Sequence, residues 1–179
     1  MSTPSNPDDH LPRRLDAGED GSRGPAILLV DDHPFALATE ALLLASMGYR
    51  RIGTAASAEA ALRLMRADPS AVDVVIWNLN MPGMEATGFL RVLGSEGFEG
   101  GVILLSGEGE RVLQTVQRLL GHGRLALLGA LQKPASRERL DELLAGWEPS
   151  VAAASAAPAV PEPAPFSGDE PRTAHDRGQ

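Results

Sequence analysis

The stretch VDVVIWN, residues 72–78, is a short apolar run that ends in a polar residue. An apolar run of this length suits a strand that is buried on both faces between layers of helices. The chain contains four further runs of this kind: AILLVD (26–31), RIGTAA (51–56), GVILLS (101–106) and LALLGAL (125–131). The sequence therefore predicts five strands of a parallel sheet.

Segments with helical periodicity lie between these apolar runs. Pro34 stands at a first-turn position, Gly48 ends the helix expected over residues 34–47, and Ser57 can cap the next helix. A third helix is expected over residues 85–93. The last two helices are marked by apolar stripes: Val112, Val116, Leu119 and Leu120, then Leu140, Leu143, Leu144 and Trp147. This alternation predicts an α/β fold, a doubly wound five-stranded parallel sheet in the flavodoxin-like order 2-1-3-4-5, with helices on both faces.

Proline placement sets the boundaries of the predicted domain. Ten of the 14 prolines lie before Ala26 or after Trp147, and these end segments are also rich in Ser, Gly, Asp and Ala. Residues 1–25 and the Pro/Ala-rich residues 148–179 are therefore expected to be disordered tails. The domain itself is expected to span residues 26–147.

Composition narrows the class of protein. A net charge of -8 and a pI near 5 argue against a nucleic-acid partner, because phosphate contacts need clustered Lys and Arg. The absence of cysteine excludes disulfides and thiolate metal sites. No apolar run is long enough to span a membrane or to act as a secretory signal. We therefore expect a cytoplasmic protein with no membrane partner.

Polar residues follow four of the five predicted strands. Asp31 and Asp32 end the first strand, Asn78 the third and Ser106 the fourth, and Lys133 follows the fifth. Ligand sites of such sheets lie at the carboxyl ends of the central strands. The spacing therefore predicts that these side chains converge on one edge of the sheet.

The segments VDDHP, NLNMPGM, VILLSG and LQKP resemble, in this order, the four signature segments of receiver domains of two-component response regulators. The resemblance covers roughly residues 26–147. It implies that Asp31, Asp32 and the backbone carbonyl of Asn80 match the residues that hold Mg²⁺. Ser106 would match the hydroxyl residue, and Lys133 the lysine, that contact the phosphoryl group of an aspartyl phosphate.

The chemistry of these residue types fits that assignment. Mg²⁺ is a hard cation that takes oxygen ligands, and a metal together with a lysine neutralises charge on a transferring phosphoryl group. Lys133 is the only lysine in the chain, against 15 arginines. A compact ammonium suits a crowded phosphoryl site better than a broad guanidinium does.

Two positions of the expected phosphoryl site depart from the pattern of the family. The phosphoryl-acceptor position holds Asn78, and an amide oxygen is a poor nucleophile that would not give the usual acyl phosphate. The missing negative charge also predicts weak Mg²⁺ binding. Ala130 stands where many receivers carry an aromatic residue whose rotation reports phosphorylation.

These departures favour a degenerate receiver, or pseudo-receiver, that signals through protein–protein interaction and is not an enzyme. The expected partners are a histidine kinase, a phosphotransfer protein or a downstream effector. A homodimer could form through helix 4 (around residues 112–120), strand 5 (residues 125–131) and helix 5 (around residues 140–147). Two alternatives remain. The chain could be a working phosphorelay receiver that uses another residue or deamidated Asn78, or a Mg²⁺-dependent hydrolase with Asp31 or Asp32 as nucleophile.

Overall fold

The sheet of this protein matches the predicted fold. The computed structural model describes residues 9–10, 24–107 and 125–147. Five parallel strands form one sheet in the order β2-β1-β3-β4-β5. The strands are β1 (Ile27–Val30), β2 (Ile52–Ala55), β3 (Val74–Asn78), β4 (Gly101–Ser106) and β5 (Ala126–Gln132). The predicted fold class and strand order are therefore confirmed.

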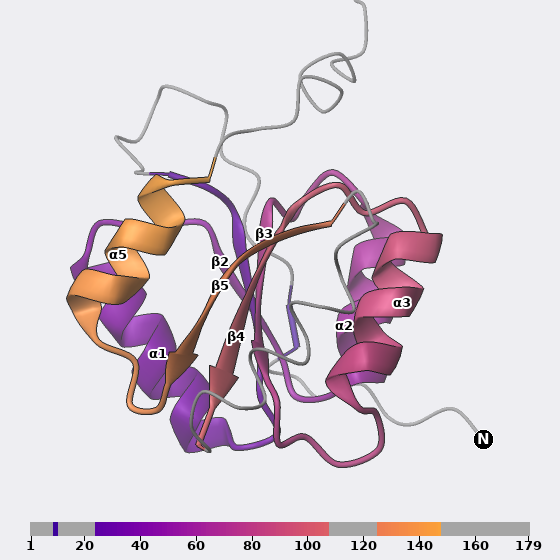
Figure 1. The fold of residues 1–179 in the computed structure, drawn as a ribbon, viewed down its shortest axis with the longest axis horizontal. Coiled ribbons are helices and arrows are strands. Elements are labelled where there is room, and N and C mark those ends of the chain that lie inside the picture. Colours follow the sequence, from indigo (N-terminus) through magenta and orange to yellow (C-terminus); the bar gives the residue numbers. More distant parts are fainter. Residues whose placement is uncertain (1–8, 11–23, 108–124, 148–179) are drawn as a thin grey trace, which may run out of the picture.

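Helices cover both faces of this sheet (Figure 1). Helices α1 and α5 lie on one face, and α2 and α3 lie on the other. Their bounds are α1 (Pro34–Ser46), α2 (Ala58–Ala67), α3 (Ala86–Ser95) and α5 (Arg137–Ala145). The third helix begins one residue later than predicted, because Glu85 is its N-cap. The helix predicted over residues 112–120 lies outside the described residues.

Local sequence signals account for where these helices begin and end. The Ser57 hydroxyl accepts a hydrogen bond from the Ala60 N–H at 3.1 Å, as predicted for an N-cap. Ser136 caps α5 in the same way, through the N–H of Arg139 at 3.3 Å. Gly48 follows α1 with a φ of 97°, a conformation that favours glycine.

Alternate residues of the strands supply two separate cores. Leu28, Val75 and Trp77 face α2 and α3, where Trp77 stacks on Phe89 with ring centroids 3.8 Å apart. The neighbouring strand residues face α1 and α5 instead: Ile27, Leu29, Val74, Ile76, Ile103, Leu105 and Leu131. Every residue of β1, β3 and β4 is buried, which explains why their sequences are apolar without alternation.

Strand register brings the polar strand ends to one edge. Val30 of β1 pairs with Trp77 of β3, so the next residues, Asp31 and Asn78, lie at the same level of the sheet. The Lys133 N–H donates to the Ser106 carbonyl at 2.8 Å, which extends the pairing of β4 with β5 to the same edge.

The N-terminal segment departs from the predicted disordered tail at the residues of it that the structure describes. His10 forms an antiparallel bridge with Thr54 on the edge strand β2, with N···O distances of 2.8 and 2.9 Å. The Asp9 carboxylate accepts a hydrogen bond from the Ala56 N–H at 2.8 Å and lies 3.8 Å from Arg63. An edge strand offers unpaired backbone groups, and these two residues satisfy some of them. Residues 24 and 25, at the end of the predicted N-terminal tail, are also described, and the Gly24 carbonyl accepts a hydrogen bond from Arg51 at 2.7 Å. The rest of the predicted tails lies outside the described residues.

Candidate functional site

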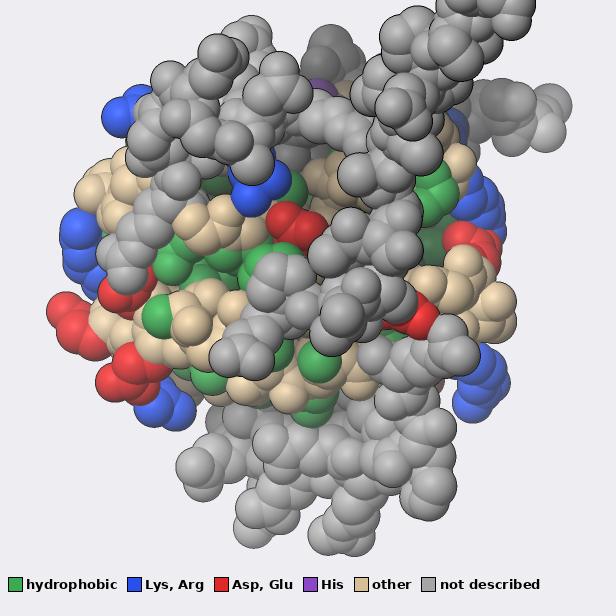
Figure 2. Space-filling model, turned by 90° about the horizontal axis from the view of Figure 1, so that it is seen from above, with side chains coloured by type: hydrophobic (Ala, Val, Ile, Leu, Met, Phe, Trp, Pro, Cys, Tyr) green, Lys and Arg blue, Asp and Glu red, His purple; other side chains and the backbone are tan. Residues whose placement is uncertain are grey.

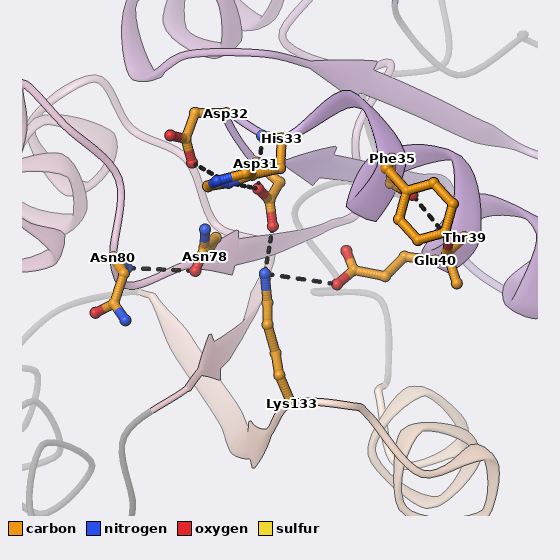
Figure 3. A network of polar contacts seen from close by, with 9 residues as sticks. All are labelled: Asp31, Asp32, His33, Phe35, Thr39, Glu40, Asn78, Asn80 and Lys133. Carbon is orange, nitrogen blue, oxygen red and sulfur yellow. Dashed lines mark hydrogen bonds and ion pairs between the residues drawn. The ribbon is translucent and has the colours of Figure 1, made fainter.

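The centre of the candidate site is an ion pair between Lys133 and Asp31 (Figure 3). Asp31 follows β1 and is fully buried, and its Oδ2 contacts the Lys133 ammonium directly. Lys133 precedes α5, is joined to Pro134 by a cis peptide bond, and also lies 3.8 Å from the Glu40 carboxylate of α1. Three elements that are distant in sequence thus place two carboxylates around one ammonium.

The second acid of the pair, Asp32, contacts a different residue. Its carboxylate lies 3.1 Å from the imidazole Nδ1 of His33, which also lies 3.3 Å from Asp31. The His33 N–H donates to Asp31 Oδ1 at 2.9 Å. The side chain of His33 is 71% exposed, but it still contacts both acids.

Asn78 lies at the end of β3, between Asn80 and the Asp31–Lys133 pair in Figure 3. The residue is 4% exposed, and its amide oxygen accepts a hydrogen bond from the Asn80 N–H at 3.3 Å. Ser106, at the end of the adjacent strand β4, is 1% exposed. The predicted polar residues therefore gather on one edge of the sheet, with Asn78 and Ser106 buried there.

Glu40 belongs to this site although the sequence interpretation did not include it. Burial raises the pKa of the Glu40 carboxyl from 4.5 to about 7. Lys133 opposes that rise, and the nearby Asp31 carboxylate adds to it. The site therefore contains a carboxyl group that gains or loses its proton near neutral pH.

A sequence signal for Glu40 exists in the pattern of α1. Leu37 and Leu44 are the buried residues of this helix, and Glu40 lies between them at helical spacing. Glu40 is also the only charged residue in α1. A lone acid on the inward side of an apolar helix indicates a polar partner inside the fold, which here is Lys133.

The oxygen ligands at this edge suit Mg²⁺ only in part. Asp31 and Asp32, together with His33, offer ligand atoms within 4.8 Å of one another, and carboxylates are preferred Mg²⁺ ligands. Both oxygens of Asp31, however, already have partners in Lys133 and the His33 N–H. A cation would have to compete with Lys133 for Asp31, and Asn78 adds no negative charge to attract it.

A cavity of about 710 Å³ lies at the opposite end of the molecule, where the strands begin. Its wall includes Met65, Leu93 and Phe98, and in Figure 2 hydrophobic side chains lie among charged ones at this end. The polar residues described above do not line it. We therefore place the candidate functional site at the other edge of the sheet.

Within the described part of the chain, no helix combines the length and apolar character needed to span a membrane.

Comparisons with known proteins agree with this geometry. Residues 27–145 match the family described as "Response regulator receiver domain". The sequence is 34% identical over 125 residues to Two-component response regulator ORR24 of Oryza sativa subsp. indica, and equally so to that of subsp. japonica. The match covers 70% of this chain and 18% of each rice protein, so the chain spans under a fifth of their length.

Solved structures show the same fold. A response regulator receiver domain protein from Clostridium thermocellum is 25% identical with a TM-score of 0.58, covering 66% of this chain and 90% of that one. The receiver domain of an HD domain-containing protein from Pseudomonas fluorescens Pf-5 is 27% identical with a TM-score of 0.57, covering 69% and 93%. A chain of the CheX–CheY–BeF₃–Mg²⁺ complex from Borrelia burgdorferi is 25% identical with a TM-score of 0.55, covering 65% and 84%.

Proposed function

Because this chain belongs to the response regulator receiver domain family of two-component signalling, we propose that it is a pseudo-receiver. It signals by binding a protein partner and does not form an aspartyl phosphate. Receiver domains interact with kinases, phosphotransfer proteins or effectors, and these classes supply the partner.

The observation that carries the proposal is the amide at the acceptor position. Asn78 lies level with Asp31 at the buried edge of the sheet, where a receiver needs a carboxylate nucleophile. Its oxygen already accepts a hydrogen bond from Asn80. An amide oxygen carries no full negative charge, so attack on a phosphoryl donor is strongly disfavoured.

The position of Lys133 supports the same proposal. In the receiver domains that this chain resembles, the lysine at this position contacts the phosphoryl group. In this protein its ammonium is paired with the buried Asp31 and has Glu40 nearby. The pair compensates two charges that would otherwise be costly to bury. Lys133 thereby stabilises the edge of the sheet without a phosphoryl group.

We further propose that Mg²⁺ binds weakly at this edge. Asp31, Asp32 and the Asn80 carbonyl would hold the ion, and the ion would supply charge neutralisation at the site. The Crystal structure of the CheX–CheY complex contains Mg²⁺ together with BeF₃. The pairing of Asp31 with Lys133 and the neutral amide of Asn78 both weaken such binding here.

Phosphorylation by a small phosphodonor tests the proposal directly. The protein is incubated with Mg²⁺ and acetyl phosphate, and the intact mass is measured. The wild type is expected to gain no mass, whereas Asn78→Asp is expected to gain one phosphoryl group. Asn80→Asp is the matched control, because it makes the same chemical change two residues away at an exposed position, and it should gain nothing.

Each other result has a definite meaning. Stable stoichiometric phosphorylation of the wild type would contradict the pseudo-receiver and favour the alternative in which another residue or deamidated Asn78 accepts the group. If Asn78→Asp gains no phosphoryl group, the missing nucleophile alone does not explain why the site is not phosphorylated. That result would contradict the central role given to Asn78.

A further inference from the structure

The outward face of α1 carries no charged side chain. Its exposed residues are small, apolar or uncharged: Pro34, Phe35, Ala38, Thr39, Leu42, Ala45 and Ser46. Phe35 is 85% exposed and Leu42 is 72% exposed, and they are the large hydrophobic residues that stand out on the described surface. A helix that is apolar on both faces is normally covered on both.

The exposed residues have a regular spacing. Phe35, Ala38, Leu42 and Ala45, which we call the α1 seam, are separated by three, four and three residues. This is the spacing at which residues of one helix face a partner helix. Large and small side chains alternate along the seam. The alternation restricts which helix can pack against it.

We propose that the α1 seam packs against the α1 seam of a second copy of this chain, with the two helices antiparallel. Phe35 then meets Ala45 of the other copy, and Leu42 meets Ala38. In each pair the two residue numbers lie equally far from residue 40. A single two-fold axis at the level of residue 40 therefore generates both kinds of contact. Every layer contains one large and one small side chain, as close packing requires.

A parallel arrangement lacks this match. It would place Phe35 against Phe35 and Ala38 against Ala38, which gives crowded layers alternating with empty ones. Empty layers lose contact energy and crowded layers force side chains from their preferred rotamers. The order of large and small residues therefore selects the antiparallel pair.

Charged residues at the two ends of α1 complement each other in the antiparallel pair. Arg137 of α5 is anchored at the carboxyl end of α1, with hydrogen bonds to the Ser46 hydroxyl at 3.1 Å and the Ser46 carbonyl at 3.2 Å. In the proposed register Ser46 lies level with Pro34 of the other copy. Asp32, whose side chain is 25% exposed, lies just before that residue. Each copy thus brings a cation toward an acid of the other.

The size of the seam sets the expected strength of association. Four side chains on a helix of 13 residues bury on the order of 1,000 Å² in total over both copies. Interfaces of this size are usually weak and transient. We therefore expect a reversible dimer with an affinity in the micromolar range. This surface differs from the helix 4, strand 5 and helix 5 surface, and the inference does not depend on Asn78.

Sedimentation velocity on the full chain over about 10–500 µM tests the dimer. The weight-average mass is expected to rise from the monomer value of 18.8 kDa toward twice that mass. Leu42→Glu should stay monomeric over the range, since its carboxylate would be buried against Ala38 of the other copy. Ser95→Glu, on α3 across the sheet, adds the same charge at an exposed position and should dimerise like the wild type.

A second variant guards against a simple folding defect. Phe35→Asp places an acid in the first turn of α1, where a negative charge favours the helix, and it should also remain monomeric. Arg139→Glu changes the exposed face of α5 and should leave dimerisation unchanged. Melting temperatures near that of the wild type would show that these proteins are folded.

Cross-linking determines the orientation, because the chain has no native cysteine. Ala38→Cys mixed with Leu42→Cys should form a disulfide-linked dimer, whereas neither variant alone should. Self-cross-linking of each single variant would indicate a parallel pair and overturn the proposed register. A monomeric wild type over the whole range, or a Leu42→Glu variant that still dimerises, would overturn the interface itself.

Discussion

Replacing Glu40 by glutamine tests whether ionisation of this buried carboxyl group destabilises the fold. Burial raises the pKa of the Glu40 carboxyl from 4.5 to about 7, and its side chain is only 15% exposed. Lys133 on the β5–α5 connection and Asp31 at the end of β1 are the charged groups that face it. Glutamine keeps the size of the side chain and cannot ionise. The substitution should therefore change how stability depends on pH.

The sign follows from proton binding in the two states. An unfolded chain loses the Glu40 proton near pH 4.5, whereas the folded chain keeps it until about pH 7. Between these values the folded state binds more protons, so the stability of the wild type falls as the pH rises through the interval. At about 1.4 kcal/mol for each unit of pKa, ionising Glu40 costs the fold at most about 3–4 kcal/mol.

Urea unfolding at several pH values measures this cost, with tryptophan fluorescence as the signal. The free energy of unfolding of Glu40→Gln minus that of the wild type should rise between about pH 5 and pH 8, by up to about 3–4 kcal/mol. Glu138→Gln, on the exposed face of α5, is the control for losing one acidic side chain. A difference between Glu40→Gln and the wild type that is constant over this range would refute the reasoning.

Lys133→Met gives the reasoning a second check. Lys133 lowers the pKa of Glu40, so its removal should raise that pKa further and move the pH-dependent interval upward. The substitution also leaves the buried Asp31 without its ammonium partner and should destabilise the protein strongly, by about 3–5 kcal/mol. The pH range over which stability changes reports the pKa of Glu40, whereas a loss of stability that is the same at every pH reports the missing partner of Asp31.

Two further predictions concern the metal and the N-terminal segment. Millimolar Mg²⁺ should raise the melting temperature little in the wild type and clearly more in Asn78→Asp, which should be the less stable protein without metal, because three carboxylates then repel one another. Equal gains would mean that the wild-type site is already a competent metal site. Asp9→Ala should lower the free energy of unfolding by about 1–3 kcal/mol, since the carboxylate is 6% exposed and accepts from Ala56. Unchanged urea unfolding would show that Asp9 contributes nothing to the fold.

The sequence alone determined the order of the strands and the edge where the polar residues meet. Apolar runs such as residues 72–78 and 101–106 are long enough to identify buried strands, and the rules of parallel sheets then fix their arrangement. The resemblance of the segment NLNMPGM to a receiver signature also predicts that Asn78 stands at the acceptor position. These features depend on neighbours along the chain, so local pattern is sufficient to predict them.

The tertiary structure decided which side chains actually meet. Asp31 and Asp32 are adjacent in sequence, yet Asp31 pairs with Lys133 while Asp32 contacts His33. Glu40 becomes part of the site because α1 packs its inward face onto the same edge. Asp9 joins the domain because the edge of β2 is open to it. Burial and contact across tens of residues set these interactions and the raised pKa of Glu40, and they exist only once the helices have packed on the sheet.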